Sequence, residues 1–266
     1  MSDSLDQSII AKVSGAILEH VDKYTIAKAS GVMLAFYGTI LFLAPQKAHD
    51  LYGTNDVLLK LKDPKSSLVI DYLVRRGAIV MVTLPAMWYL HVDAGLSREK
   101  AAGVCILPMI LFCLHSLLNE LPKQMGSSSR ADISSLVISI PVAYVTLSGA
   151  SYSDIALKSF WGYSLATGLL AYFTPSAIDT VYDTPEREEF VLLQRSVFGA
   201  NLINVALFGG AFAMGMDDTK AVGIAWASAF FTLLLKLKDL QKFNLSTGPI
   251  YIWLALQAFF AFTLLL

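Results

Sequence analysis

The chain has 266 residues, of which 55% are hydrophobic and 15% are charged, and its formal net charge is −1. Soluble domains contain about 45–50% apolar and about 25% charged residues, so this chain has more apolar side chains than one soluble core can bury. A nucleic-acid partner is not expected either, because its recognition requires a basic face. Composition and charge therefore predict an integral membrane protein in contact with membrane lipid.

The first 27 residues contain no apolar stretch of the length found in a signal peptide. Within them, apolar residues recur at three- and four-residue steps from Ile9 to Val21, with Lys12 and Glu19 between them. This spacing predicts that residues 1–27 include a short amphipathic helix that lies on the membrane surface.

Eight apolar runs follow, each near the length that a helix needs to cross roughly 30 Å of hydrocarbon. Lipid offers the backbone no hydrogen-bond partner, so long runs without alternation are expected to be helices. The expected spans are 28–44, 77–93, 101–118, 133–151, 158–174, 197–215, 221–237 and 248–266. The sequence thus predicts an all-α fold, a polytopic membrane helical bundle of about eight transmembrane helices.

An internal repeat organises the chain. The segment GTILFLAPQKAHDLYGT begins at Gly38, and the segment GLLAYFTPSAIDTVYDT begins at Gly168. Farther along, Lys-Ala-Ala-Gly at 100–103 matches Lys-Ala-Val-Gly at 220–223. The other matched pairs are Pro45 and Pro175, Tyr52 and Tyr182, Thr54 and Thr184, and Arg75 and Arg195. So many matches in one order predict an ancestral duplication.

The duplication divides the chain into one four-helix unit at 28–151 and a second at 152–266. Because four is an even number, both units are expected to enter the membrane from the same side, as a parallel repeat. About seven of the 20 Lys and Arg residues fall on the amino-terminal side and the others on the opposite side. The positive-inside rule then predicts that the opposite side is cytoplasmic. We expect an endomembrane location, in the endoplasmic reticulum.

Three arginines, Arg75, Arg76 and Arg195, stand where the second and sixth spans begin. One interpretation is a site for an anion or a lipid headgroup at the membrane edge. The other is structural, because long cationic side chains extend to the interface and fix the depth of a helix. The carboxylates expected to face them are Asp71, Glu188 and Glu189.

The sixth span carries three amide side chains, Gln194, Asn201 and Asn204, within roughly one helix face. Buried amides in membrane helices need partners, either on a neighbouring helix or on a ligand in a polar cavity. The corresponding first-unit positions hold Val74, Met81 and Leu84. Both helix adhesion and ligand binding therefore remain open for these amides.

Two carboxylates near span ends, Asp93 and Glu120, are candidate general acids, because burial at a membrane edge favours the protonated form. Solvation of the loops is the alternative. His91 and His115 lie near them, but the spacing matches no metal site. The sequence contains no Gly-rich phosphate loop and no haem-type pair of histidines, so no metal or cofactor is expected.

The order of Gly, Pro and an Arg that opens the next helix resembles the DoxX-like small membrane proteins. The likeness covers both units, through Gly38, Pro45 and Arg75 and their counterparts Gly168, Pro175 and Arg195. That broad group implies no single activity. Size, helix number and aromatic content are also similar to fungal integral-membrane terpene cyclases. This second resemblance implies a buried carboxylic acid that protonates a polyprenyl substrate, but it assigns no residue here.

We therefore expect a membrane protein that takes up a lipophilic small molecule, and the first hypothesis is an acid-initiated isoprenoid cyclase or isomerase. Aromatic faces would stabilise its cationic intermediates, and the bundle would exclude water. The alternative is a non-catalytic scaffold or complex subunit with a membrane-protein partner. A transporter is less favoured, because the spans lack the ionisable residues typical of coupled ion pathways.

Overall fold

The computed structural model describes residues 22–182 and 187–266, and all regular structure within them is helical. Eight helices are long: α2 (Lys23–Leu43), α5 (Ser66–Val92), α6 (Arg98–Leu118), α8 (Arg130–Ser148), α9 (Ser153–Phe173), α11 (Glu189–Ala213), α12 (Asp218–Lys242) and α13 (Thr247–Leu265). Four are short: α3 (Pro45–Tyr52), α4 (Asn55–Leu58), α7 (Leu121–Gln124) and α10 (Ala177–Tyr182). The all-α class is confirmed. Most of the expected amphipathic segment and the matched Thr184 lie outside the described residues.

The long helices extend beyond the apolar runs that predicted them. Helix α5 begins at Ser66 rather than at residue 77, and α11 begins at Glu189 rather than at residue 197. Both helices continue through polar turns, such as the one around Arg75, because those side chains find partners inside the bundle. In α5 and α11 the apolar run therefore marks only part of the helix, and it places the start of the helix too late.

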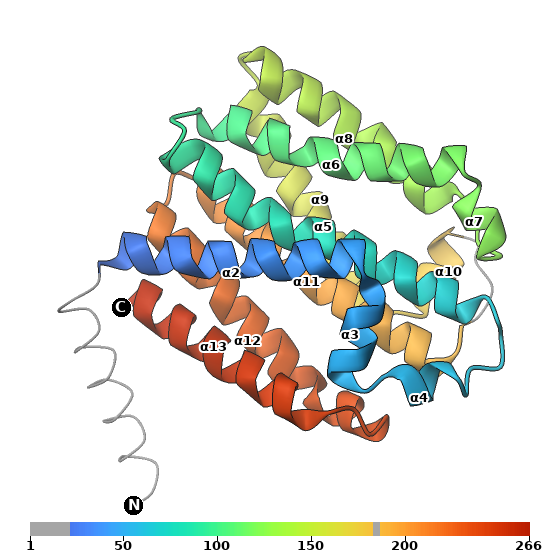
Figure 1. Cartoon of the computed structure of the whole chain (residues 1–266). Helices are drawn as coiled ribbons and strands as arrows, with labels where there is room; N and C mark the ends of the chain where they lie inside the picture. The colour runs from blue at the N-terminus through green and yellow to red at the C-terminus, as the bar shows by residue number, and fades with distance from the viewer. Residues whose placement is uncertain (1–21, 183–186) are drawn as a thin grey trace, which may run out of the picture.

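Helix packing follows the same order in the two halves of the chain. In the first half α2 packs on α5, α5 on α6 and α6 on α8, and in the second half α9 packs on α11, α11 on α12 and α12 on α13. Helices α5 and α11 pack on each other, while the pairs α8–α9 and α13–α2 join the halves. Figure 1 shows α6 and α8 along one side of the bundle and α12 and α13 along the other.

Glycine allows two of these helix pairs to approach closely. A Cβ atom on Gly38 of α2 would lie 2.8 Å from Cγ2 of Val82 on α5. On Gly168 of α9, it would lie 3.0 Å from Cβ of Leu202 on α11. Small residues let membrane helices pack backbone against backbone, which explains a glycine at both matched positions.

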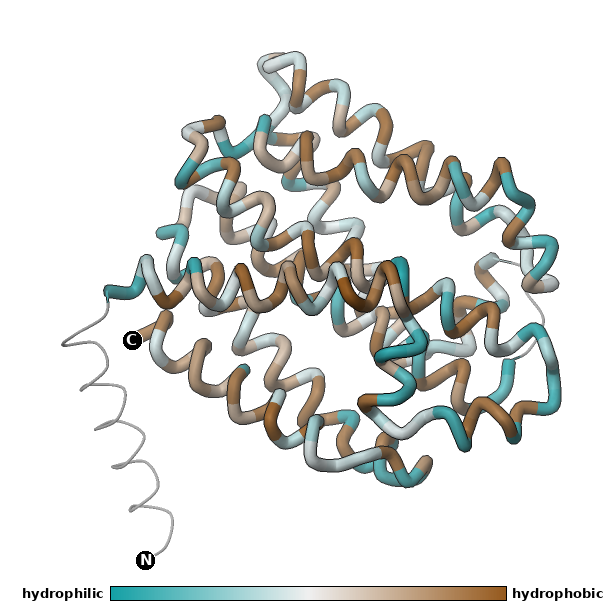
Figure 2. The backbone as a smooth tube through the Cα atoms, in the orientation of Figure 1, coloured by the Kyte–Doolittle hydropathy of each residue, from teal (hydrophilic) through white to brown (hydrophobic). Residues whose placement is uncertain are grey.

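Large apolar side chains cover the outside of the bundle. Phe36 is 69% exposed, Leu111 is 65% exposed and Ile252 is 63% exposed, each on a different helix. Apolar stretches fill the middle of the helices, and polar residues gather mainly near their ends (Figure 2). Six helices, α2, α6, α8, α11, α12 and α13, are long and apolar enough to cross a membrane. The chain is therefore a multi-pass membrane protein in its architecture.

Candidate functional site

Two of the cavities that the described residues form lie between the long helices. The first, called cavity A, has a volume of about 250 Å³ and lies between α2, α3, α5, α11, α12 and α13. Its walls are mainly apolar, and its polar side chains include Tyr37, His49, Tyr52, Thr54, Gln194, Asn201, Asn204, Thr232, Lys236 and Gln257. The three amides of the sixth span, proposed from the sequence, thus lie together at this cavity.

Most amides of cavity A have no hydrogen-bond partner among the described residues. Asn204 Oδ1 accepts a hydrogen bond of 2.7 Å from the Ser228 hydroxyl. Among the described residues, the side chains of Gln194 and Asn201 make no hydrogen bond. On α13, Oε1 of Gln257 is buried and likewise has no partner among them. Three amides in an apolar interior therefore keep unused hydrogen-bonding capacity.

Other polar side chains of cavity A make hydrogen bonds within the protein. His49 Nδ1 lies 2.9 Å from the Thr54 hydroxyl, and His49 Nε2 lies 3.1 Å from Asp71 Oδ1. The hydroxyls of Tyr37 and Tyr52 are 2.7 Å apart. These pairs connect the end of α2, α3 and α5, so they fix the shape of this part of the wall.

The second cavity, called cavity B, has a volume of about 180 Å³ and lies between α5, α6, α8, α9, α10 and α11. Some of its other polar side chains gather around Asp132 on α8, whose own side chain is 2% exposed. This carboxylate accepts hydrogen bonds from Tyr72 and, at 2.6 Å, from Ser116. Arg76 NH1 lies 3.5 Å from the same carboxylate, and Arg76 NH2 donates to Ser135 at 2.5 Å. The Asp132 carboxylate is therefore fully paired within the protein, whereas Nε of Arg76 is buried without a hydrogen-bond partner among the described residues.

Arg75 and Arg195, matched in the sequence, make corresponding contacts. Arg75 NH1 donates to the Phe42 carbonyl at 2.5 Å, and Arg195 NH1 donates to the Pro175 carbonyl at 2.8 Å. Each contact ties a central helix to the end of the helix before it. Arg195 also forms an ion pair of 2.8 Å with Asp179, and both side chains are at most 10% exposed. Of the two arginines, only Arg195 lines a cavity, cavity B.

The carboxylates expected to face these arginines have other partners. Asp71 contacts His49, as described above. Glu188 accepts hydrogen bonds from the backbone N–H groups of Asp63 and Lys62 and from the Ser66 hydroxyl. These bonds, first that of Asp63, lower the pKa of Glu188. The expected pairing was wrong for Asp71, which contacts α3, and for Glu188, which is bonded by the α4–α5 loop. The sequence does not reveal the positions of these two segments.

Neither candidate acid lines a described cavity. Asp93 forms an ion pair of 2.6 Å with Lys28 and accepts a hydrogen bond from Tyr24. These contacts tie the end of α5 to the start of α2, and the Asp93 side chain is 14% exposed. Glu120 pairs with Lys123 at 3.1 Å, and its side chain is 65% exposed. Solvation of a helix end therefore fits Glu120, whereas Asp93 joins two helices.

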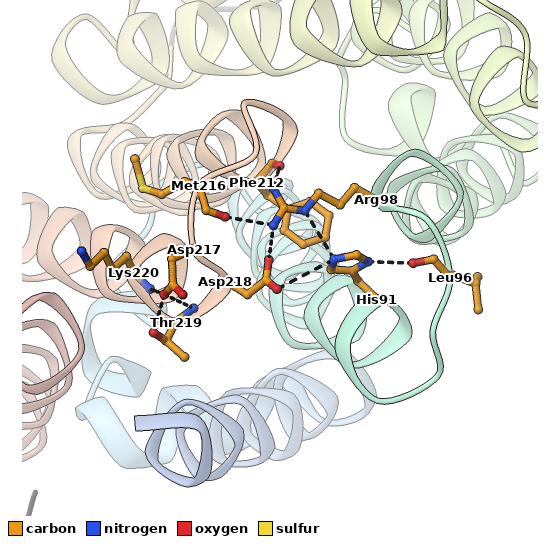
Figure 3. A network of polar contacts seen from close by, with 9 residues as sticks. All are labelled: His91, Leu96, Arg98, Phe212, Met216, Asp217, Asp218, Thr219 and Lys220. Carbon is orange, nitrogen blue, oxygen red and sulfur yellow. Dashed lines mark hydrogen bonds and ion pairs between the residues drawn. The ribbon is translucent and has the colours of Figure 1, made fainter. Parts of the chain in front are cut away.

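A polar network lies at the end of the bundle where the α5–α6 and α11–α12 connections meet (Figure 3). Arg98 donates to the carbonyls of Phe212 and Met216, each at 3.0 Å, and pairs with Asp218 at 2.8 Å. His91 accepts from Arg98 Nε at 3.3 Å. The network joins the two halves of the chain.

The part of the chain that the structure describes holds no cluster of side chains able to bind a metal ion.

Sequence reasoning missed Asp132, Lys236 and Gln257. Asp132 precedes the fourth apolar run, where it looks like an ordinary loop residue. Lys236 belongs to a cationic cluster that indicates only the membrane edge. Gln257 could have been recognised from the sequence, because it is a lone amide within an apolar run. Like Asn201, such a buried amide needs a hydrogen-bond partner.

Comparison of the chain with family models, with curated proteins and with solved structures finds no match. The resemblance to DoxX-like proteins and to terpene cyclases therefore stays a hypothesis from the sequence. No catalytic residue is carried over from a relative, and the chemistry of the two cavities is the basis for a function.

Proposed function

We propose that the chain crosses the membrane eight times and arose by duplication of a four-helix unit. The matched order of helix packing, the Arg75 and Arg195 contacts and the glycines at matched positions support the duplication. Helix α5 is less apolar than the six clear spans because of Asp71, Arg75 and Arg76. All three bond to groups inside the bundle, so α5 presents little charge to lipid.

Cysteine labelling tests this topology. Cysteines introduced at Lys62 and Lys238 are expected to react from one side of the membrane, and a cysteine at Ser153 from the other. The native Cys105 and Cys113 are both buried, which keeps the background low. Reaction of all three introduced cysteines from one side would refute the eight-span arrangement.

We propose that cavity A binds a lipophilic small molecule that carries a hydrogen-bonding oxygen. The observation that supports this most is a set of three amides in an apolar cavity, Gln194, Asn201 and Gln257, that have no hydrogen-bond partner among the described residues. An unsatisfied polar group in a membrane interior costs several kcal/mol, so a bound ligand that bonds to these amides offsets that cost. The apolar walls would hold the rest of the molecule.

An isoprenoid fits this description, and an isoprenoid cyclase or isomerase remains the proposed enzyme class. Its initiating acid is not Asp93 or Glu120 in this proposal, because neither lines a described cavity. No carboxyl group of the described residues lines cavity A. A proton for chemistry there would come from His49, which contacts the Asp71 carboxylate, or from Lys236. Binding of the lipophile is thus the function that this site supports best.

The test is to purify the protein from a host supplied with polyprenyl intermediates and to identify bound molecules by lipid extraction and mass spectrometry. The wild-type protein is expected to carry a lipophile, and the triple variant Gln194→Leu, Asn201→Leu, Gln257→Leu is expected to lose it. Gln241→Leu is the matched control, because this amide is exposed and lies outside both cavities.

A lipophile retained equally by the triple variant would refute the site, and so would a wild-type protein that binds none. A cyclised or isomerised product in the extract would assign catalysis to the same chain. Folding of each variant is checked by its thermal unfolding in detergent.

A further inference from the structure

The charge inside cavity A is one-sided. Of the described residues that line it, Lys236 is the one Lys or Arg, and none is Asp or Glu. Cavity B differs, because its Arg76 and Arg195 each pair with a buried carboxylate. The carboxylate that pairs with Lys236, that of Asp239, does not line cavity A. An apolar cavity whose lining carries a cation and no carboxylate favours a ligand with a negative charge.

Lys236 is held at this wall. Its side chain is 20% exposed, and its ammonium group lies 5.0 Å from the centre of the Tyr172 ring. Asp239 lies 3.3 Å from Lys236, but the same carboxylate is also 3.4 Å from Lys242. One carboxylate shared by two lysines leaves a net positive charge, and Lys236 is the member of the group that lines the cavity.

The cation and the amides lie at different depths. Ser228 on α12 bonds to Asn204 on α11, which places these two residues at one level. Lys236 follows eight positions later on the same helix, about 12 Å farther along its axis at 1.5 Å per residue. A charged head at Lys236 therefore lies nearer the end of the bundle, and the chain of the ligand passes Asn201 and Asn204.

We infer that cavity A takes a lipophilic anion, whose charged head pairs with Lys236 and whose chain carries its hydrogen-bonding oxygen near Asn201 and Asn204. This inference rests on the proposed function of cavity A as a lipophile site. The ion pair would be partly shielded from water, so it discriminates between charged and uncharged heads more strongly than an exposed pair does. Either a phosphate head or a carboxylate head would supply the negative charge that pairs with Lys236.

The experiment compares two probes with the same chain, hexadecyl phosphate and hexadecanol, on the full-length protein in uncharged detergent. Bromine on the chain of each probe reports binding through quenching of Trp226 and Trp253, both of which line cavity A. The wild-type protein is expected to bind the phosphate about tenfold more tightly than the alcohol. Lys236→Gln is expected to remove this preference and Lys236→Arg to keep it.

Lys238→Gln is the matched control, because it removes the same charge two residues away, at an exposed position outside the cavity. The inference is overturned if the wild-type protein binds both probes equally or if Lys238→Gln weakens phosphate binding as much as Lys236→Gln does. Equal binding of both probes leaves the lipophile site intact. Failure of both probes to quench the tryptophans would overturn this inference and the proposed function together.

Discussion

Cavities A and B lie between corresponding helices, yet their polar groups behave differently. Tyr52 lines cavity A, and its repeat counterpart Tyr182 lines cavity B. In cavity B the carboxylate of Asp132 is surrounded by protein donors. In cavity A the amides of Gln194 and Asn201 have no donors or acceptors from described residues. One cavity therefore uses its polar groups for stability, and the other leaves them open for a ligand.

The largest expected effect is that of Asp132→Asn in cavity B. Loss of this carboxylate leaves Arg76 buried without its counter-charge, which typically destabilises a protein by about 3–5 kcal/mol. Thermal unfolding in detergent measures the effect, with Asp154→Asn as control. Asp154 pairs with Lys158 at an exposed site, so its loss should cost less than about 1 kcal/mol. Equal stability of the two variants would contradict a structural role for cavity B.

A second comparison uses the matched arginines. Arg195→Gln removes the counter-charge of the buried Asp179 and is expected to cost about 3 kcal/mol. Arg75→Gln removes a hydrogen bond to the Phe42 carbonyl and is expected to cost about 1 kcal/mol. Both are measured by thermal unfolding of the purified variants. A larger loss for Arg75→Gln would mean that the two units do not use this position as described.

A smaller effect is expected at Asp217, which caps the N-terminus of α12. Its carboxylate accepts hydrogen bonds from the Thr219 hydroxyl and from backbone N–H groups, which lowers its pKa below 3.8. A lowered folded-state pKa means that this stabilisation is present above about pH 4 and is lost as the pH falls through the folded pKa. Asp217→Ala should cost about 1 kcal/mol at neutral pH.

Unfolding at several pH values measures this contribution. The difference between wild type and Asp217→Ala should shrink in acid, because the protonated side chain no longer accepts the same hydrogen bonds. A difference that grows as the pH falls would contradict this assignment of the cap.

The fold was more predictable than the site. Long apolar runs located the helices, because lipid demands a bonded backbone and an apolar surface. The amides of Asn201 and Gln194 were recognisable for the same reason, since polar groups inside such a run need a partner. The ion pair between Asp93 and Lys28 was not predictable, because residues 65 positions apart meet only through helix packing.

The burial of Asp132 could not be predicted from the sequence either. In the sequence it precedes an apolar run and looks solvated, whereas in the fold its side chain is 2% exposed. The partner that buries it, Arg76, lies on a different helix, and the register between the two helices is set by side-chain packing. Sequence periodicity carries no information about that register.

The most direct test of the difference between the cavities is thermal unfolding of the variant Gln194→Leu, Asn201→Leu, with and without a hexadecyl phosphate that carries a keto oxygen in the middle of its chain. Without the probe, the substituted protein is expected to unfold at the wild-type temperature or slightly above, because these amides have no partner to lose among the described residues. The probe is expected to raise the unfolding temperature of the wild-type protein and to leave that of the variant unchanged. A variant that is strongly destabilised without the probe, yet is stabilised by it as much as the wild type, would contradict a ligand role for these amides.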